Sequence, residues 1–358
     1  MTQVFLIHQN SIQHYRVPIY NYLHQYLYRL GFFLSVVSEG IQKGNATKVE
    51  FPFLEVDLRF QSLRRLISAY DPQIVILFVN LNNSFLFPFL LQLKFSRRKI
   101  VYWGHGIDLQ DKNSLIKRRL YSAEHALCDA LILYAEHLKQ YVSRRFLGKT
   151  FVANNTLYFP PDEKGPLDTH AILAKYGIVT DKNIVLAGRL QKRKRIEDLV
   201  GAFKILSRDD VGLILVGPDE ERIAAQAKEQ NKNIYALGPL YGQEVTDLLK
   251  ACDIYCMPGA IGLSIVDAFH CGLPVITEKV SHGPEIMYLR DGVNGFLVDR
   301  GDRKALAERI NLLLTDKQLY TRFSLAAKKE IETHGHIDHL CEGFLECLDY
   351  VGGIKLKK

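Results

Sequence analysis

The sequence contains only six cysteines among 358 residues, and no two of them form a C-x-x-C pair or follow a regular spacing. This pattern argues against a disulfide framework. We expect reduced and mostly buried thiols, as in a cytoplasmic protein. The six positions are Cys128, Cys252, Cys256, Cys271, Cys341 and Cys347.

Long apolar runs are also missing. No stretch reaches the roughly 18 consecutive apolar residues that a membrane-spanning helix requires. The most apolar segment, residues 74–93, is interrupted by three asparagines and by Pro88. The sequence starts directly with the apolar run 4–7, without the basic segment or cleavage site of a secretory leader. We therefore expect no spanning helix, no export and a cytoplasmic location.

Acidic residues are scarce in the first half of the chain. Residues 1–160 carry 19 Lys and Arg against 10 Asp and Glu, a net charge of +9. Residues 161–358 carry 27 against 29, a net charge of −2. We expect the first half to meet an anionic partner. Nucleic acid is not the expected partner, because no recognisable RNA- or DNA-binding module accompanies the basic residues.

Short β-branched or aromatic runs alternate with helical stretches, which is typical of parallel α/β layers. The alternation lapses at the turn-rich segment 160–166, where we expect a linker, and then restarts. The tail from residue 308 onward is helical without a further strand. Strands are predicted at 4–8, 32–38, 74–78, 99–103 and 130–133, and then at 183–186, 212–216, 234–236, 254–257 and 274–276.

These patterns predict an α/β protein with two Rossmann-like parallel-sheet domains that face a cleft. We expect a first domain at residues 1–165, a second at 166–330 and a helical tail at 331–358. Ligands of open parallel sheets bind at the carboxyl ends of the strands. Functional residues are therefore expected in the loops that follow the strands.

A cluster of cations follows the first predicted strand of the second half. Gly188 supplies a turn, and Arg189, Lys194 and three further cations lie within the next seven residues. Arg binds a diphosphate as a planar fork and Lys binds it as a point charge. The alternative is a solvated charge run, but cations at the start of a helix oppose its dipole. We favour an anionic ligand.

A glycine-containing loop follows the fourth strand of the second half and enters a helix near Leu263. Amides at a helix N-terminus bind phosphate without any side chain. Gly262, Leu263 and Ser264 are therefore candidates for holding the same diphosphate. Asp267 lies one turn into the helix, where its carboxylate could accept hydrogen bonds from ribose hydroxyls.

In the first half, His105 lies between two glycines directly after the strand that ends at Trp103. Its place at a strand end favours a functional role. A lone histidine is more commonly a satisfied hydrogen-bonding group. Both interpretations stay open on the residues alone.

At these residues the chain resembles glycosyltransferase family 4, a large GT-B family that includes many bacterial polysaccharide transferases. The resemblance runs in order through residues 183–330, and the first half matches more loosely, chiefly at 104–108 and 153–155. The matching residues are Gly188, Arg189, Leu190, Lys194, Gly262, Leu263, Asp267, Ala268, Gly272, Pro274, Val275 and Ile276, with the segments 282–285 and 291–298.

The resemblance implies a GT-B fold whose C-terminal helices pack back toward the first domain. It also implies a retaining transfer of a hexose-type sugar from a nucleotide diphosphate sugar, a UDP-sugar in preference to a GDP-sugar. Arg189 and Lys194 would clamp the diphosphate, and His105 would lie by the transferred sugar. The acceptor would be a glycan or lipid-linked glycan of cell-surface polysaccharide synthesis. We expect no metal and no cofactor besides this co-substrate, and the sequence has no Asp-x-Asp motif.

Two departures from the family pattern bear on donor and acceptor identity. The family motif has two glutamates separated by seven residues, and the corresponding positions are Gly259 and Asp267. The second position keeps a carboxylate on a shorter arm, whereas the first loses it. The glycine pair frequent in the first acceptor-side loop is absent from residues 8–16.

Other functions stay open. A GT-B-shaped sugar-nucleotide epimerase, or a pseudoenzyme that only binds nucleotide, fits the missing carboxylate at Gly259. His334, His336, Asp338 and His339 reproduce the H-x-H-x-D-H spacing of a zinc metallohydrolase. That motif should follow a strand, but it lies between two helical stretches, and no histidine follows His339. The zinc interpretation is therefore the least favoured.

The basic excess suggests that the first domain docks on the anionic inner face of the plasma membrane. The cations gather at 64–65, 94–99, 117–119 and 144–145, and the apolar segment 84–95 overlaps one of these clusters. Apolar residues beside cations are what an interfacial helix needs. The same segment is apolar nearly all round, so a helix buried against the sheet is the alternative.

Overall fold

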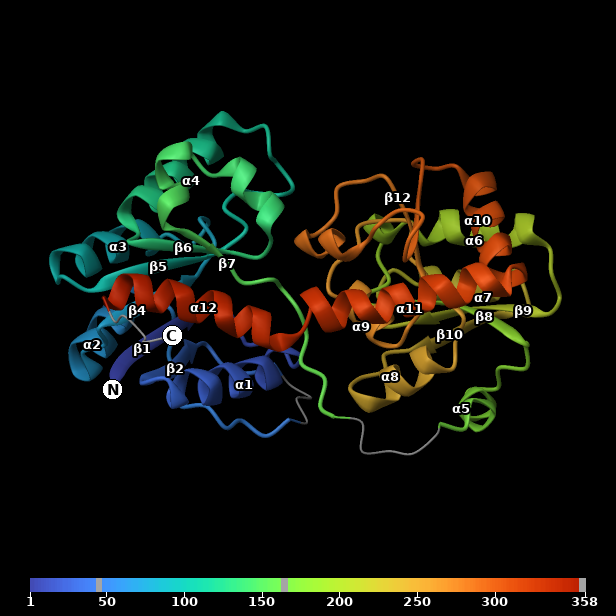
Figure 1. Ribbon diagram of the computed structural model, residues 1–358, viewed down its shortest axis with the longest axis horizontal. Helices are drawn as coiled ribbons and strands as arrows, with labels where there is room; N and C mark the ends of the chain where they lie inside the picture. The colour runs from blue at the N-terminus through green and yellow to red at the C-terminus, as the bar shows by residue number, and fades with distance from the viewer. Residues whose placement is uncertain (43–46, 162–166, 354–358) are drawn as a thin grey trace. The chain divides into compact units, whose positions relative to one another are not determined.

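The computed structural model describes residues 1–42, 47–161 and 167–353, and the chain forms two compact units (Figure 1). Unit 1 comprises Met1–Phe159 and His336–Lys358, and unit 2 comprises Pro160–Gly335. The helical tail predicted at 331–358 is therefore not a separate part. Its first residues complete a helix of unit 2, and the rest returns to unit 1, because the helix breaks at Gly335 and His336.

Unit 1 contains a seven-stranded parallel sheet in the order β3-β2-β1-β4-β5-β6-β7. All five predicted strands are present. Strands β3 and β7 were not predicted, because they are three-residue edge strands that are only partly buried and show no apolar run. The strands are β1 (Thr2–His8), β2 (Phe32–Ser38), β3 (Phe53–Glu55), β4 (Ile74–Phe78), β5 (Lys99–Gly104), β6 (Ala130–Leu133) and β7 (Thr150–Val152).

Helices cover this sheet on both faces. In the first of them Pro18 occupies the third position, apolar side chains at helical spacing are buried, and Gly31 follows the end with φ of 89°. The α-helices of unit 1 are α1 (Arg16–Arg29), α2 (Phe60–Tyr70), α3 (Leu86–Phe95), α4 (Leu115–Leu127) and α12 (Ile337–Gly352), and the 3-10 helices are η1 (Glu136–Tyr141) and η2 (Arg144–Lys149).

Helix α3 settles the interpretation of the apolar segment 84–95. Leu86, Phe89, Leu90 and Leu93 are fully buried. Leu91 is 46% exposed, and Phe95 at the far end is 87% exposed. The segment is thus mainly a helix packed against unit 1, and most of its apolar surface is unavailable to a membrane.

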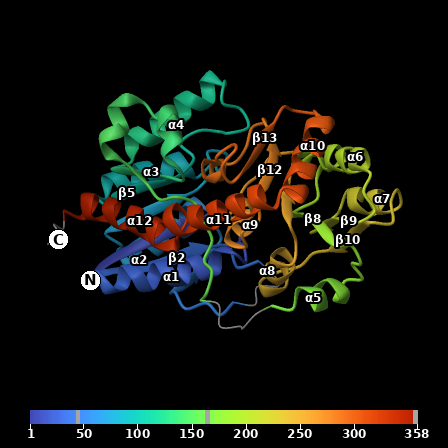
Figure 2. The same cartoon turned by 45° about the vertical axis from the view of Figure 1, so that its right-hand side comes forward.

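Helix α12 belongs to the core of unit 1. It packs against β6, β7 and α1, and Figure 2 shows it beside these elements. The Phe344 ring lies 4.9 Å from that of Trp103 on β5, and the Tyr22 hydroxyl of α1 donates to Asp338 Oδ1 over 2.6 Å. The expectation that C-terminal helices pack back toward the first domain is confirmed for α12. Helix α11, by contrast, stays with unit 2.

Unit 2 contains a six-stranded parallel sheet in the order β10-β9-β8-β11-β12-β13. Its five predicted strands are present, and β13 is an additional strand at the edge. The strands are β8 (Lys182–Ala187), β9 (Val211–Val216), β10 (Ile234–Gly238), β11 (Ile254–Cys256), β12 (Val275–Glu278) and β13 (Gly295–Val298).

The helices of unit 2 follow its strands in alternation, as a parallel sheet requires. Among the described residues, no helix of either unit is long and apolar enough to cross a bilayer. The α-helices are α5 (Thr169–Lys175), α6 (Ile196–Leu206), α7 (Ile223–Lys228), α8 (Gln243–Lys250), α9 (Ser264–His270), α10 (Arg303–Thr315) and α11 (Lys317–His334), and the 3-10 helices are η3 (Lys192–Lys194) and η4 (Pro284–Tyr288).

The contact of α12 with β7 depends on Gly343. A Cβ at this position would lie 2.1 Å from the Val152 carbonyl oxygen. We expect Gly343→Ala to lower the free energy of unfolding by about 1–3 kcal/mol, the range for overpacking a core contact. Urea unfolding measures the change. Gly148→Ala, where a Cβ meets nothing within 4 Å, should stay within about 0.5 kcal/mol of wild type. Equal stability of the two variants would contradict the packing of α12.

Candidate functional site

Two glycine turns pack backbone against backbone at the carboxyl edge of the unit 2 sheet. Gly188 follows β8 with φ of 135°, and Gly217 follows β9 with φ of 138°. A Cβ on Gly217 would lie 1.9 Å from the Gly188 carbonyl oxygen. The Gly188 amide donates to the Val216 carbonyl over 2.9 Å. The sequence analysis gave no weight to Gly217, because a single glycine after a strand does not show which backbone lies against it.

The predicted cation cluster lies directly after this turn. Arg189 and Arg193 are exposed, whereas the side chain of Lys194 is buried. Burial, and then the charges of Arg193 and Arg189, lower the pKa of Lys194 to about 8, and Glu285 opposes this shift. Within residues 1–42, 47–161 and 167–353, none of these three cations forms an ion pair with a carboxylate. The cluster thus holds like charges together without an ion pair, and Glu285 offsets them only in part.

Arg195, which the sequence grouped with this cluster, has a different role. Its Nε lies 2.7 Å from Glu278 Oε2, and its Nη2 lies 2.7 Å from Asp198 Oδ2. Its backbone adopts the left-handed region with φ of 53° as it joins η3 to α6. Arg195 is therefore a structural residue.

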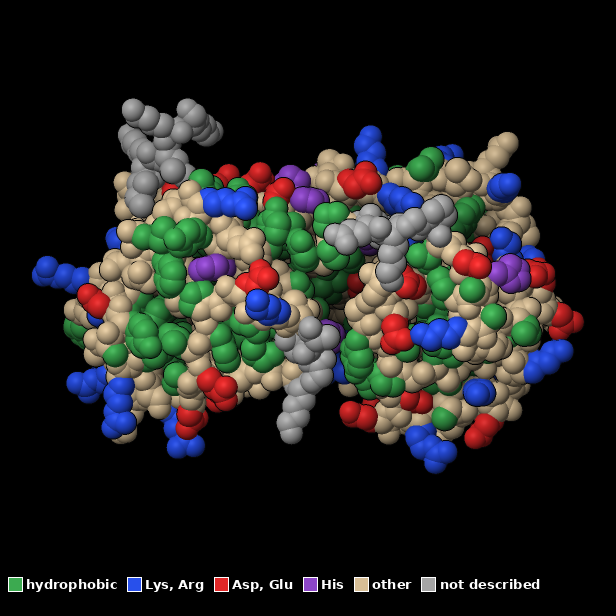
Figure 3. Space-filling model, turned by 90° about the horizontal axis from the view of Figure 1, so that it is seen from below, with side chains coloured by type: hydrophobic (Ala, Val, Ile, Leu, Met, Phe, Trp, Pro, Cys, Tyr) green, Lys and Arg blue, Asp and Glu red, His purple; other side chains and the backbone are tan. Residues whose placement is uncertain are grey.

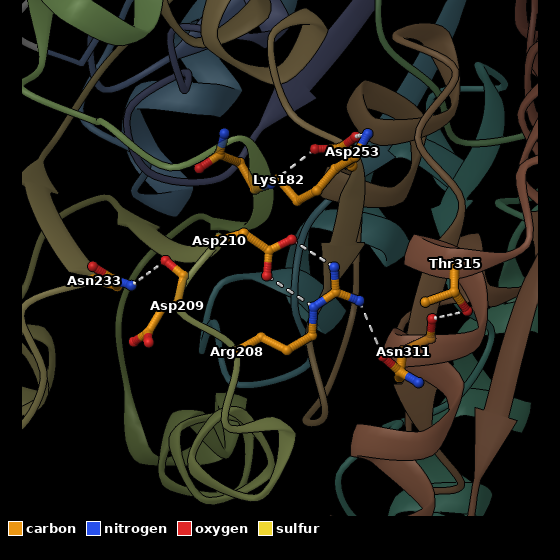
Figure 4. A network of polar contacts seen from close by, with 9 residues as sticks. Lys182, Arg208, Asp209, Asp210, Asn233, Asp253, Asn311 and Thr315 are labelled. Carbon is orange, nitrogen blue, oxygen red and sulfur yellow. Dashed lines mark hydrogen bonds and ion pairs between the residues drawn. The ribbon is translucent and has the colours of Figure 1, made fainter.

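At the opposite, amino edge of the same sheet, cations are paired with carboxylates (Figure 4). Lys182 Nζ lies 3.0 Å from Asp253 Oδ1. Arg208 donates two hydrogen bonds to Asp210, over 2.6 and 3.0 Å, and a third to Asn311. These cations are neutralised within the unit, unlike those at the carboxyl edge.

Lys194 links the cation cluster to the loop before α9. Its ammonium donates to the Ala260 carbonyl over 2.5 Å and lies 3.2 Å from Met257 Sδ. Its own carbonyl accepts a hydrogen bond of 2.9 Å from the Gly259 amide. The loop after β8 and the loop after β11 are therefore joined at the residue that carries the buried charge.

The backbone explains why position 259 has no carboxylate. A Cβ on Gly259 would lie 2.2 Å from the Arg193 carbonyl oxygen and 2.5 Å from the Lys194 backbone. No side chain fits there while the two loops stay paired. A carboxylate approaches from η4 instead, since Glu285 Oε2 lies 3.7 Å from where a Cβ on Gly262 would be. The sequence analysis matched the segment containing Glu285 but gave that residue no role.

The predicted amide group lies at the start of α9. Among the described residues, the amides of Gly262, Leu263 and Ser264 donate no hydrogen bond. The Ser264 side chain interacts with the Tyr255 hydroxyl, which donates to the Ala187 carbonyl over 2.7 Å. This contact brings the start of α9 beside the end of β8. The helix has only seven residues, so its dipole adds little to these amides.

Asp267 has an unusual environment for a carboxyl group. Burial raises its pKa to about 7. Its carboxylate makes no hydrogen bond or ion pair in the described part of the chain. The structure thus gathers the predicted residues Gly188, Arg189, Lys194, Gly262, Leu263, Ser264 and Asp267 at one edge of unit 2.

His105 belongs to unit 1, in the loop after β5. Its ring centroid lies 5.0 Å from that of Tyr134. Burial and then the charge of Arg16 lower the pKa of His105 to about 4, against an opposing effect of Asp108. Its imidazole is therefore neutral at physiological pH.

The histidine-rich segment near residue 336 does not assemble a zinc site. His334 pairs with Glu330 over 3.0 Å at the end of α11. His336 caps α12 by accepting from the Asp338 amide, and His339 lies 3.1 Å from Glu342. Throughout the described ranges, no group of three or more His, Cys, Asp or Glu side chains has the arrangement of a metal site.

The comparison with protein families gives a match to the second unit. Residues 168–330 match the family described as Glycosyl transferases group 1. N-acetyl-alpha-D-glucosaminyl L-malate synthase of Bacillus anthracis is 28% identical over 171 residues, 46% of this chain and 44% of that protein. Phosphatidyl-myo-inositol mannosyltransferase of Mycobacterium leprae is 30% identical over 161 residues, 43% and 42% of the two chains. The chain thus matches less than half the length of these relatives.

Solved structures match over the whole chain. Anabaena Alr3699/HepE in complex with UDP has a TM-score of 0.77 at 19% identity and covers 98% of this chain and 100% of that one. A putative UDP-N-acetylglucosamine 2-epimerase from Listeria monocytogenes has a TM-score of 0.69 at 15% identity, over 97% and 95%. At these identities the similarity shows the fold alone. The resemblance to GT-B glycosyltransferases and the two Rossmann-like sheets predicted from the sequence are confirmed.

The pairing of the two loops predicts that a side chain at position 259 lowers the stability of the protein. We expect Gly259→Ala to lower the melting temperature by several degrees, because the new Cβ collides with backbone that cannot move aside cheaply. Gly262→Ala is the matched control, since its Cβ meets only Glu285 Oε2, at an ordinary contact distance. Differential scanning calorimetry compares the two. A Gly259→Ala protein as stable as wild type would show that position 259 can accept a side chain.

Proposed function

We propose, on the premise that residues 168–330 are a glycosyl transferases group 1 domain in a chain of GT-B fold, that this protein is a retaining glycosyltransferase. It transfers a hexose-type sugar from a nucleotide diphosphate sugar to a glycan or lipid-linked glycan acceptor. The observation that carries the proposal is the uncompensated group of Arg189, Arg193 and Lys194 at the carboxyl edge of unit 2. A diphosphate supplies the negative charge that this edge lacks.

The donor is held by groups from two loops. Arg189 and Lys194 bind the diphosphate, and the unused amides of Gly262 to Ser264 add hydrogen bonds to its oxygens. Asp267 accepts from the ribose hydroxyls. A UDP-sugar is preferred to a GDP-sugar, and the UDP complex of Alr3699/HepE, a protein of the same fold, supports this choice.

The chemistry follows from where charge develops. As the bond between sugar and diphosphate breaks, negative charge grows on the leaving diphosphate, and the cations stabilise it. The acceptor attacks from the side that the diphosphate leaves, so the anomeric configuration is retained. These side chains supply the stabilisation without a metal ion. His105 remains neutral and donates or accepts a hydrogen bond at the transferred sugar.

A sugar-nucleotide epimerase is the second candidate. Gly259 favours it, because a carboxylate expected beside the donor sugar is absent, and the fold also occurs in a putative epimerase. Incubation of UDP-sugars with and without a glycan acceptor separates the two functions. A transferase releases UDP in proportion to acceptor, whereas an epimerase interconverts the sugar without acceptor and without release of UDP.

The pKa of Lys194 predicts how diphosphate affinity depends on pH. This pKa is about 8 in the free protein, and a bound anion raises it. Affinity is therefore fully present below pH 8 and is lost as pH rises through that value. Between pH 7 and pH 9 we expect the dissociation constant of UDP, measured by calorimetry, to rise about tenfold.

The control for this prediction is Lys194→Arg, which stays charged throughout the range. Its UDP affinity should vary much less with pH. Titration of UDP itself affects both proteins equally, so the difference between them reports on Lys194 alone.

Lys194→Ala should cut turnover by roughly two to three powers of ten. If the UDP affinity of wild type and of Lys194→Arg depended on pH in the same way, Lys194 would not be a group that binds the diphosphate.

For His105 we expect a loss of turnover without a loss of stability. His105→Ala removes a partly exposed ring whose main contact is Tyr134, so the melting temperature should stay close to wild type. The value of kcat should fall about a hundredfold. Because the pKa of His105 is about 4, the wild-type rate should show no limb near pH 6.5 from this residue. His137→Ala, an exposed histidine of unit 1, is the control, and unfolding of His105→Ala would indicate a structural role.

We further propose that unit 1 docks on an anionic membrane surface through α4 instead of α3. Leu115 and Ile116 on α4 are 68% and 73% exposed, and Leu120 is also exposed. Arg118 and Arg119 lie between them and form no ion pair with the described residues. This is the apolar and basic composition of an interfacial helix. The face of unit 1 in the left half of Figure 3 mixes Lys and Arg with Asp and Glu.

Liposome flotation tests this surface. Wild type should float with vesicles that contain phosphatidylserine and much less with phosphatidylcholine alone, and 0.5 M salt should release it. Ile116→Asp should abolish binding. Val179→Asp introduces the same change at an exposed apolar residue of unit 2 and should bind as wild type. Flotation that does not depend on lipid charge, or no flotation at all, would contradict membrane docking and leave a soluble acceptor as the proposal.

A further inference from the structure

Six side chains, five of them buried and Phe78 half-buried, meet at the carboxyl edge of the unit 1 sheet, where β1, β4, β5 and β6 end. The central one is Arg16, the first residue of α1. Its guanidinium lies 4.8 Å from the Phe78 ring centroid and 5.1 Å from that of Trp103. Its Nη2 donates to the Tyr134 hydroxyl over 3.0 Å. The other two members are His8 and Tyr20, whose rings lie 5.9 Å apart.

The charge of Arg16 is buried without a counterion. The residue is 4% exposed, and its Nε and Nη1 have no hydrogen-bond acceptor in the described ranges. No described carboxylate forms an ion pair with it. The indole N–H of Trp103 is likewise buried without an acceptor. Burying a charge or a donor in this way is costly unless a partner compensates it.

The groups around Arg16 add no negative charge. Burial and then Arg16 lower the pKa of His8 to about 3, and the same two causes lower the pKa of His105 to about 4. Both rings are therefore neutral at physiological pH. The nearby Asp108 is held by Lys117 over 2.7 Å.

The start of α1 points to the same need. This helix has 14 residues, its N-cap Tyr15 contributes no side-chain hydrogen bond, and its first turn has no acidic residue. The first-turn amides are not available to a ligand, because those of Arg16 and Val17 donate to the Gln13 and His14 carbonyls and Pro18 has no N–H. The helix dipole still favours an anion at this end. A buried unpaired arginine and the positive end of a helix dipole thus coincide at one place.

We propose that the unpaired guanidinium of Arg16, at the positive end of the α1 dipole, binds an oxyanion of the acceptor, a phosphate ester or a sugar carboxylate. This inference rests on the proposed function and deepens it, because it makes the acceptor of this enzyme an acidic molecule. The rings of Phe78, Trp103 and Tyr134 line the approach to the charge. Entry of the anion moves the Tyr15 side chain, which covers one side of the guanidinium at 5.8 Å.

Trp103 is the only tryptophan of the chain and therefore reports directly on this site. The experiment titrates the protein of residues 1–358 with glycerol phosphate, sodium glucuronate and glucose, at constant ionic strength and with UDP at saturation. We expect a saturable change of tryptophan fluorescence with one or both anions and none with glucose. The anion that gives the lower dissociation constant identifies the class of acceptor.

Variants separate this site from the donor site. Arg16→Gln should lose the fluorescence response while retaining UDP binding by calorimetry. Lys194→Ala should lose UDP binding while retaining the fluorescence response. Failure of UDP to bind wild type would overturn the proposed function but not the anion site. Absence of a response in wild type, or an equal response in Arg16→Gln, would overturn the anion site and leave Arg16 as a structural residue held by the aromatic rings.

A second measurement decides the question if Arg16→Gln does not fold. The Arg16 Nε–H resonance of wild type is assigned by comparison with Arg16→Lys and followed during the titration. Saturable displacement of this resonance, with the dissociation constant found by fluorescence, supports the proposal. A resonance that does not move with either anion contradicts it.

Discussion

Like charge held together without an ion pair is the constraint on which the candidate site in unit 2 depends. Arg189 and Arg193 act on a buried Lys194, and both burial and repulsion disfavour its charged form. This arrangement costs the free protein stability. A bound dianion removes the repulsion and restores the full charge of the lysine, so that the same groups which destabilise the free protein give affinity for a diphosphate.

Glycine makes this arrangement possible. Gly217 lets the turn after β9 lie against the turn after β8, and Gly259 lets the loop after β11 lie against Arg193 and Lys194. These backbone contacts fix the cations at one edge of the sheet. The amino edge contains pairs such as Lys182 with Asp253. The two edges of one sheet therefore differ in charge pairing, and that difference makes the carboxyl edge the candidate site.

Much of the fold could be predicted from the sequence, because interior strands of a parallel sheet are buried on both faces and show as apolar runs. Strands β3, β7 and β13 are short strands at the edges of their sheets and were not recognised. The cations, Asp267 and the amides at 262–264 were found because they follow strands in a recognisable order. Gly217 and Glu285 were missed, because their importance lies in which backbone or loop they approach across the fold. The burial of α3 likewise depends on packing that an all-apolar helix does not reveal.

The central claim is that unit 2 recognises a diphosphate through uncompensated cations. A calorimetric comparison of UDP with uridine on the wild-type protein tests it most directly, because the two ligands share base and ribose and differ in the diphosphate alone. The account predicts that UDP binds at least about a hundredfold more tightly than uridine, with an affinity that falls as salt rises. Equal affinities, or a preference for UDP that salt does not weaken, would contradict it.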